Sequence, residues 1–171
     1  QDGSGFGVEI DYLQEEEPLG TAGALGMLPP QDDPLLVING DILTNINFAR
    51  MLDFHNQHKA DMTIGVRDYR VRVPYGVIEC NGPDVMGVTE KPVQTFLVNA
   101  GIYVISPAAQ QRIPQEHRYD MTDLVENLLA DSKRVISFPI VEYWLDIGRP
   151  DDYLRGQTDV ENGVLDDVVR D

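Results

Sequence analysis

The sequence predicts an α/β fold in which helices flank a mixed, mostly parallel sheet. Short segments rich in valine and isoleucine alternate with segments of helical periodicity, as expected when strands are joined by crossover helices. The run Leu35–Ile38 is apolar on both faces, which is typical of a buried parallel strand. The segment 62–105 holds several strand patterns and few helical ones. We therefore expect a small β-rich insertion beside the main sheet.

Eight short segments have the composition of strands and are bounded by Gly, Pro, Asn or Asp. The predicted strands are Val8–Leu13, Leu35–Asn39, Met62–Arg67, Gly76–Cys80, Val85–Glu90, Phe96–Ile105, Val135–Ile140 and Tyr143–Leu145.

The predicted helices lie between these strands. They are Gly20–Leu28, Phe48–Gln57, a short helix opened by Ser106-Pro107, Asp120–Ala130 and Pro150–Val160. Asn47 and Asp120 are expected to be N-caps, because short polar side chains accept hydrogen bonds from the free N–H groups of a first helical turn. Residues 1–160 therefore form one domain portion, and 161–171 an acidic tail.

Composition narrows the class of protein. The chain has 171 residues and a net charge of −16, which disfavours binding to nucleic acid or to anionic membranes. No apolar run approaches the roughly 20 residues of a membrane span. The single cysteine, Cys80, cannot form an internal disulfide, and no Cys/His cluster suits zinc. We expect a cytoplasmic protein.

Two aspartates end apolar runs. Asp41 follows Leu35–Ile38 and Asn39-Gly40, and Asp146 follows Tyr143–Leu145. Open α/β sheets bind ligands at the carboxyl ends of their strands, so the two carboxylates can meet in one crevice. Carboxylate oxygens are ligands that Mg²⁺ prefers. A turn at Asn39–Asp41 explains that segment about equally well when it is taken alone.

Four further segments carry weaker signals. Gly20-Thr21 begins a stretch of small residues at a helix start, where free N–H groups can receive a base or phosphate, although a tight helix–sheet contact explains it as well. Glu90-Lys91 offers a hydroxyl acceptor and a phosphate contact, or a plain surface ion pair. Gly76 permits close backbone approach, and Asn99 places an amide in an apolar strand.

Together, and in this order, these motifs closely resemble the sugar-phosphate nucleotidyltransferase family, with its mannose-1-phosphate guanylyltransferase-like members as the nearest branch. The matching segments are Glu17–Leu25, Asn39–Asp41, Tyr75–Val77, Glu90–Pro92, Asn99–Tyr103 and Trp144–Gly148. The resemblance implies the Rossmann-like fold of nucleotide-diphospho-sugar transferases. It also implies transfer of a nucleotidyl group from an NTP to a sugar 1-phosphate, giving an NDP-sugar and pyrophosphate.

The resemblance also implies a role for each matching residue. The catalytic residues would be Asp41, Lys91 and Asp146, and Asp41 and Asp146 would also bind Mg²⁺. The sugar phosphate and the sugar would contact Gly76, Glu90, Lys91 and Asn99. The nucleotide would contact Gly20, Thr21 and Asp41. GTP and mannose 1-phosphate are the leading substrates, and glucose 1-phosphate with a thymidylyl or uridylyl donor is the alternative.

The chain departs from the family pattern at the loop that binds the triphosphate. The family's Gly-rich loop, which cradles the triphosphate and ends in Thr-Arg, has no counterpart here. The chain therefore resembles the carboxyl-terminal portion of the catalytic domain. We expect it to be inactive alone and to self-associate as a homo-oligomer. We also expect further amino-terminal segments, such as CBS domains, to precede it in the complete protein. A non-catalytic regulatory relative is the competing interpretation. A dehydrogenase is set aside because Gly3–Gly7 has the wrong glycine spacing and precedes a strand.

Overall fold

The computed structural model describes residues 2–165. Its main sheet has four strands in the order β1-β6-β3-β7, with bounds Leu35–Ile38, Val93–Ile105, Met62–Arg72 and Val135–Pro139. β6 pairs antiparallel with both β1 and β3, and only β3 and β7 are parallel. The α/β class with a mixed sheet is confirmed. The expected excess of parallel pairing is wrong for these strands, because β6 runs back along both of its neighbours.

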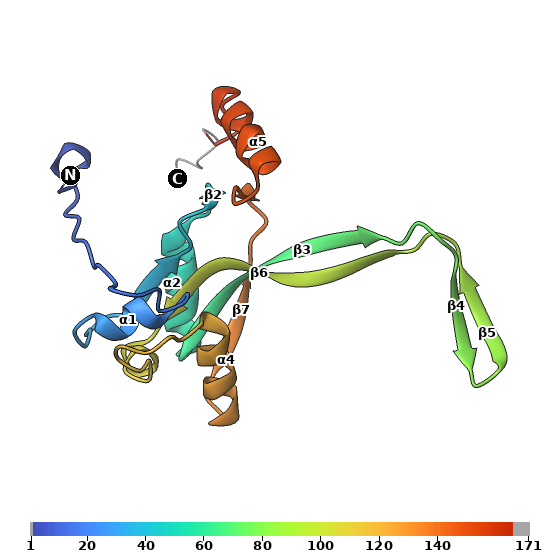
Figure 1. Cartoon of the computed structure of the whole chain (residues 1–171), viewed down its shortest axis with the longest axis horizontal. Helices are drawn as coiled ribbons and strands as arrows, with labels where there is room; N and C mark the ends of the chain where they lie inside the picture. Colours follow the sequence, from blue (N-terminus) through green and yellow to red (C-terminus); the bar gives the residue numbers. More distant parts are fainter. Residues whose placement is uncertain (1, 166–171) are drawn as a thin grey trace.

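Helices cover both faces of this sheet (Figure 1). Alternate side chains of β6 point to opposite faces, so Tyr103 and Ile105 join one buried cluster while Ile102 and Val104 join the other. The first cluster packs α4 (Met121–Ala130) and the short helices α1 (Gly23–Met27) and α3 (Pro107–Gln110), and the second packs α2 (Phe48–His58). A last helix, α5, spans Pro150–Glu161.

Both expected helix caps are present. The Asn47 side chain accepts a hydrogen bond from the backbone N–H of Arg50, which starts α2. Asp120 and Asp123 form a reciprocal capping box at the start of α4, in which the Asp123 carboxylate accepts from the Asp120 N–H. These local interactions explain why both helices begin at the predicted positions.

Two smaller sheets complete the fold. β2 (Ile42–Thr44) pairs antiparallel with β8 (Trp144–Asp146), and β4 (Val77–Asn81) pairs antiparallel with β5 (Asp84–Thr89). The predicted strand Val8–Leu13 is wrong, since this segment has no strand pairing and follows only a short 3₁₀ turn, η1, at Ser4–Phe6. Its alternating pattern is typical of a strand, but this segment does not hydrogen-bond with the edge strand of any sheet in the described chain.

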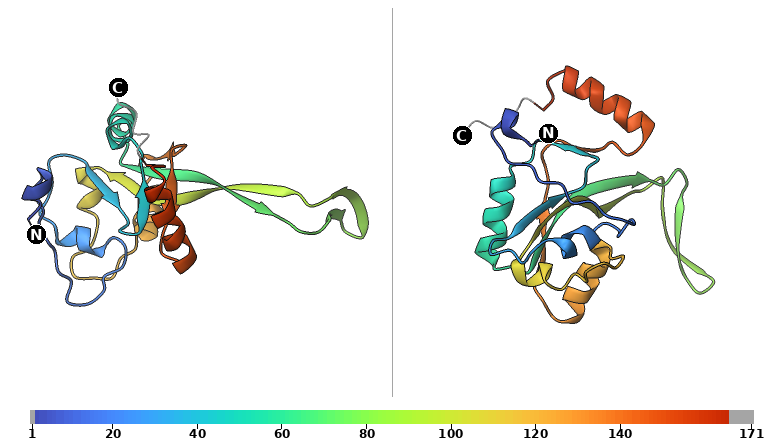
Figure 2. Two further views of the ribbon diagram at one scale, coloured as in Figure 1. Left: turned by 90° about the horizontal axis from the view of Figure 1, so that it is seen from above. Right: turned by 60° about the vertical axis from the view of Figure 1, so that its left-hand side comes forward.

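The middle of the chain forms a long projection that we call the arm, residues 67–97. It consists of the outer halves of β3 and β6 and of the hairpin β4/β5. Figures 1 and 2 show it extending away from the helices and from the rest of the sheet. On β6 the side chains before Val98 are exposed, and those from Ala100 to Ile105 are buried. The expected β-rich segment is thus present, as an extended arm.

Within residues 2–165 no helix has both the length and the apolar character needed to cross a bilayer. The predicted acidic tail begins inside α5, at Glu161, and its residues 166–171 lie outside the described part of the chain.

Candidate functional site

The structure brings Asp41 and Asp146 together. β2 and β8 pair so that Ile42 lies opposite Asp146, and the N–H of Ile147 donates to the carbonyl of Asp41 over 2.8 Å. A methyl group added at Gly148 would lie 3.1 Å from Oδ2 of Asp41 and 3.1 Å from Oδ1 of Asp146. The two carboxylates therefore face one small space beside Gly148, which we call the carboxylate pair.

Strand β8 is held by hydrogen bonds of Trp144 and of the preceding residue, Tyr143, to the part of the molecule outside the arm, which we call the body. The indole Nε1 of Trp144 donates to the carbonyl of Ala100 over 2.8 Å. The N–H of Tyr143 donates to Oδ1 of Asn45 over 3.0 Å, and the hydroxyl of Thr44 donates to the carbonyl of Tyr143 over 2.7 Å. These contacts hold Asp146 at the level of Ala100 on β6.

Arg67 adds a contact that sequence analysis missed. Its guanidinium donates to the carbonyl of Glu142 over 2.8 Å and lies 5.9 Å from the centre of the Trp144 ring. The residues that it joins are 75 or more positions apart, so no local pattern signals the interaction. Arg67 thus braces the segment leading into Asp146 at the point where the arm leaves the body.

The carboxylate pair has a charge that its own chain does not balance. Among the described residues, neither Asp41 nor Asp146 forms an ion pair with a lysine or arginine. Both side chains are exposed, and no third acidic, histidine or cysteine side chain of residues 2–165 completes a metal cluster with them. Two neighbouring carboxylates repel each other and favour a cation between them. Their oxygens suit a hard divalent ion that keeps several waters.

A second group gathers three of the predicted sugar-phosphate residues. Lys91 Nζ lies 3.8 Å from Oε1 of Glu90, and a methyl group added at Gly76 would lie 3.0 Å from Oε2 of the same glutamate. Lys91 has a left-handed backbone, with φ of 46°, in the turn between β5 and β6. Gly76, Glu90 and Lys91, which we call the arm cluster, are therefore neighbours in space.

The arm cluster does not lie beside the carboxylate pair of the same chain. The pair is held at the level of Ala100, whereas Lys91 precedes Val93, the first residue of β6. The seven residue-to-residue steps from Val93 to Ala100 span about 23 Å of extended strand at ~3.3 Å per step. A lysine side chain is far too short to cross that gap. The expected single crevice holding two acids and a base is thus divided between the body and the arm.

Asn99 is already engaged within the body. Its Nδ2 donates to the hydroxyl of Tyr103 over 2.6 Å, and its Oδ1 accepts from the N–H of Gly101 over 3.0 Å. Burial raises the pKa of Tyr103. Gly101 has φ of 70° and accepts at its carbonyl from the N–H of Asn39, 2.9 Å away. The amide therefore helps to shape the backbone beside Asn39–Asp41, a structural role that the sequence left open.

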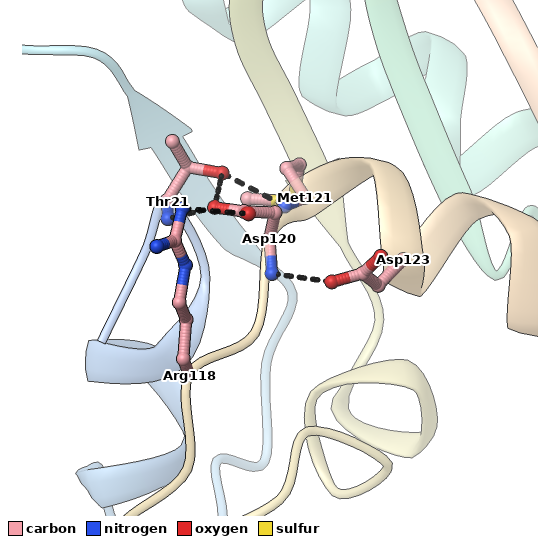
Figure 3. A network of polar contacts seen from close by, with 5 residues as sticks. All are labelled: Thr21, Arg118, Asp120, Met121 and Asp123. Carbon is pink, nitrogen blue, oxygen red and sulfur yellow. Dashed lines mark hydrogen bonds and ion pairs between the residues drawn. The ribbon is translucent and has the colours of Figure 1, made fainter.

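Thr21 meets the start of α4 (Figure 3), and Gly20 directly precedes it in the chain. The N–H of Thr21 donates to Oδ1 of Asp120 over 2.9 Å, and the Thr21 hydroxyl accepts from the N–H of Met121 over 2.8 Å. The hydrogen bond from Thr21 and the nearby Arg118 hold the pKa of Asp120 below its usual value. Gly20 has φ of 83° and no room for a side chain against Asp120. The Thr21 amide expected to be free for a nucleotide is thus paired within the chain.

Comparison with known proteins identifies the family. The model of the nucleotidyl transferase family, described as "Nucleotidyl transferase", matches residues 1–163. The chain belongs to this family. It is 34% identical over 172 residues to a mannose-1-phosphate guanylyltransferase of Mycobacterium tuberculosis, with 95% of this chain and 47% of that protein covered. It is 34% identical over 160 residues to the catalytic subunit beta of the Danio rerio enzyme of that name, with 88% and 44% covered. The resemblance to sugar-phosphate nucleotidyltransferases is confirmed.

Solved structures agree on the fold. HddC from Yersinia pseudotuberculosis superposes with a TM-score of 0.63 at 23% identity, over 89% of this chain and 67% of that one. A Bacillus anthracis protein assigned as a glucose-1-phosphate thymidylyltransferase, crystallised with sucrose, gives a TM-score of 0.67 at 20% identity, over 92% and 67%. The chain spans about half the length of the curated relatives it matches.

Proposed function

We propose that the complete protein transfers a nucleotidyl group from an NTP to a sugar 1-phosphate, and that this chain supplies the carboxylate pair and the sugar-phosphate residues. The observation that carries the proposal is the convergence of Asp41 and Asp146 on the space beside Gly148. GTP and mannose 1-phosphate are the first candidates, because two curated relatives at 34% identity are named for that reaction. Cys80 is exposed, and this chain has no second cysteine with which it could form a disulfide, which supports a location in the reducing cytoplasm.

Asp41 and Asp146 would hold Mg²⁺, which supplies charge neutralisation for the phosphates when bound. The residues fit this role, because two exposed carboxylates share one space and have no basic partner among the described residues. Gly148 leaves that space open, and its N–H fixes Oδ1 of Asp146 over 2.9 Å. Nucleotidyl transfer asks mainly for positioning and electrostatics, which such a pair can provide.

The chain's other residues would position the acceptor. Lys91 would contact the phosphate of the sugar 1-phosphate, and Glu90 would accept hydrogen bonds from sugar hydroxyls. Gly76 lies against the Glu90 carboxylate and lets the backbone approach the sugar closely. With the phosphate oxygen of the sugar held in line behind the α-phosphate of the NTP, the bond to that phosphorus forms as the bond to pyrophosphate breaks.

The test uses the complete gene product with each NTP against a panel of sugar 1-phosphates. Release of pyrophosphate with GTP and mannose 1-phosphate is expected. Asp41→Asn and Asp146→Asn should each lower kcat by at least a hundredfold. The matched control is Asp33→Asn, an exposed aspartate outside the site, which should leave kcat unchanged. Normal turnover in both site variants would overturn the proposal, as would absence of pyrophosphate release with every substrate pair.

A further inference from the structure

Helix α5 packs against β2 and β8, which we call the strand pair and which lead to the two aspartates. The buried residue of α5 is Gly156. A methyl group added at Gly156 would lie 3.1 Å from Cγ2 of Ile147 and 3.4 Å from Cδ2 of Leu43. Leu43 is the middle residue of β2, and Ile147 directly follows β8. Figure 1 shows α5 beside β2 and apart from the four-stranded sheet. The helix therefore touches the strand pair at Gly156.

A glycine in the middle of α5 is not explained by helix formation. Glycine weakens a helix interior relative to alanine, because its backbone loses more conformational freedom on folding. The backbone of Gly156 lies outside the left-handed region, so no turn requires a glycine there. The feature that does require it is the close approach of the helix to Ile147 and Leu43. Gly156 thus sets how near α5 comes to the strand pair.

A polar contact ties the same helix to the residue before β8. The hydroxyl of Tyr143 donates to Oδ2 of Asp159 over 2.6 Å, and Nε of Arg155 lies 3.5 Å from the same oxygen. The carbonyl of Tyr143 accepts from the hydroxyl of Thr44, the last residue of β2. Tyr143 is thus held by α5 and by β2, shortly before Asp146 in the chain.

The strand pair depends on such contacts for its shape. β2 and β8 have three residues each, and a two-stranded sheet of this size is marginally stable on its own. The bond from Trp144 to Ala100 fixes it to β6. The N–H of Ile147 in turn donates to the carbonyl of Asp41. A displacement of Ile147 would therefore move the backbone of Asp41 relative to Asp146.

We propose that α5 sets the separation of the two carboxylates, with Gly156 and Asp159 as positioning residues for the ion that the carboxylate pair binds. Gly156 fixes the distance between the helix and Ile147, and Asp159 fixes the place of Tyr143 ahead of β8. Neither residue contacts the ion, because each acts through the strand pair. This inference rests on the proposed function, since it assigns the support for the metal site of that reaction.

Gly156→Ala tests the spacing, read by titration of the chain with Mn²⁺. The added methyl group should push Ile147 by a few tenths of an ångström and lower Mn²⁺ affinity about tenfold, as is typical of changes next to metal ligands. Thr158→Ala is the matched control, because Thr158 is exposed on the same helix and alanine also favours the helix there. The control should bind Mn²⁺ like the wild type. Urea unfolding is measured in parallel, since a purely structural role for Gly156 would change the free energy of unfolding and leave Mn²⁺ affinity unaltered.

Two variants at Asp159 test the polar contact. Asp159→Ala and Asp159→Asn both remove the negative charge, but only asparagine keeps an oxygen that can accept from the Tyr143 hydroxyl. We expect Mn²⁺ affinity to fall about tenfold in Asp159→Ala and to stay close to the wild-type value in Asp159→Asn. Because the change in charge is the same in both, their difference reports the hydrogen bond.

The outcomes separate this inference from the proposed function. Wild-type Mn²⁺ affinity in both Gly156→Ala and Asp159→Ala would overturn the inference and leave the metal site standing. An equal loss in Thr158→Ala would also overturn it, because the effect would then belong to any change in α5. A wild-type chain that binds no Mn²⁺ would overturn the inference and the proposed metal site together.

Discussion

Replacing Gly148 by alanine is a sharp way to perturb the carboxylate pair without removing a carboxylate. The added methyl group would stand 3.1 Å from Oδ2 of Asp41 and 3.1 Å from Oδ1 of Asp146. The backbone at Gly148 is outside the left-handed region, so alanine brings no backbone strain there, and the residue is exposed. The substitution therefore acts on the space between the two oxygens and leaves the fold intact.

The size of the effect follows from these distances. Contacts of 3.1 Å are shorter than ordinary carbon–oxygen contacts, so both carboxylates must shift by a few tenths of an ångström. Mg²⁺ and Mn²⁺ sites depend on the orientation of their ligands, and small changes next to a ligand typically cost about 10–100-fold in metal affinity. We expect a loss in that range for Gly148→Ala, or about 1.4–2.7 kcal/mol.

The assay is titration with Mn²⁺, following the free ion by electron paramagnetic resonance. Gly40→Ala is the matched control, because Gly40 precedes Asp41 and an added methyl group there meets nothing within 4 Å. It should bind Mn²⁺ like the wild type. Equal Mn²⁺ affinity in Gly148→Ala and wild type would refute the geometry, and an equal loss in Gly40→Ala would show that the loop, not the space between the oxygens, decides binding.

Three further predictions concern other groups. In the complete protein, Lys91→Ala should raise KM for the sugar phosphate at least tenfold with little change in KM for the NTP, and an unchanged sugar-phosphate KM would remove that role from Lys91. Burial holds the pKa of His55 below its ordinary value of 6.5. As pH drops below about 6.5, the imidazole therefore binds a proton in the unfolded chain before it does so in the folded one, and the free energy of unfolding should fall. Urea unfolding should show a shallower pH dependence in His55→Gln than in the wild type. Burial and the bond to Asp159 raise the pKa of Tyr143 to about 12, so its stabilising effect should be lost as pH rises from about 10 through 12. The difference in tyrosinate absorbance between wild type and Tyr143→Phe should titrate near 12, and a midpoint near 10 would contradict this.

The meeting of Asp41 and Asp146 could be predicted from the sequence, because both residues end apolar runs and such ends gather at the ligand side of an α/β sheet. The strand pairing that brings these two residues together could not be predicted. β2 was not predicted as a strand, and its antiparallel pairing with β8 brings the two residues together. The three residues of β2 directly follow the turn-forming residues Asn39-Gly40, so the sequence indicates a turn there rather than a second strand.

The position of Lys91 shows the opposite case. Its neighbours Glu90 and Gly76 lie close together, since a short hairpin joins the two segments. Its distance from the carboxylate pair was not foreseen, because the order of motifs along a chain gives no information about the length or direction of a two-stranded ribbon. Val8–Leu13 has a clear strand pattern and no strand partner, which shows that alternation alone does not make a strand.

The central claim is that Asp41 and Asp146 hold one divalent ion between them. Anomalous scattering from a crystal of this chain grown with Mn²⁺ tests it most directly. We predict a single peak within bonding distance of a carboxylate oxygen from each aspartate, beside Gly148. A peak that touches only one of the two, or occupied Mn²⁺ sites elsewhere with none at this pair, would contradict the account.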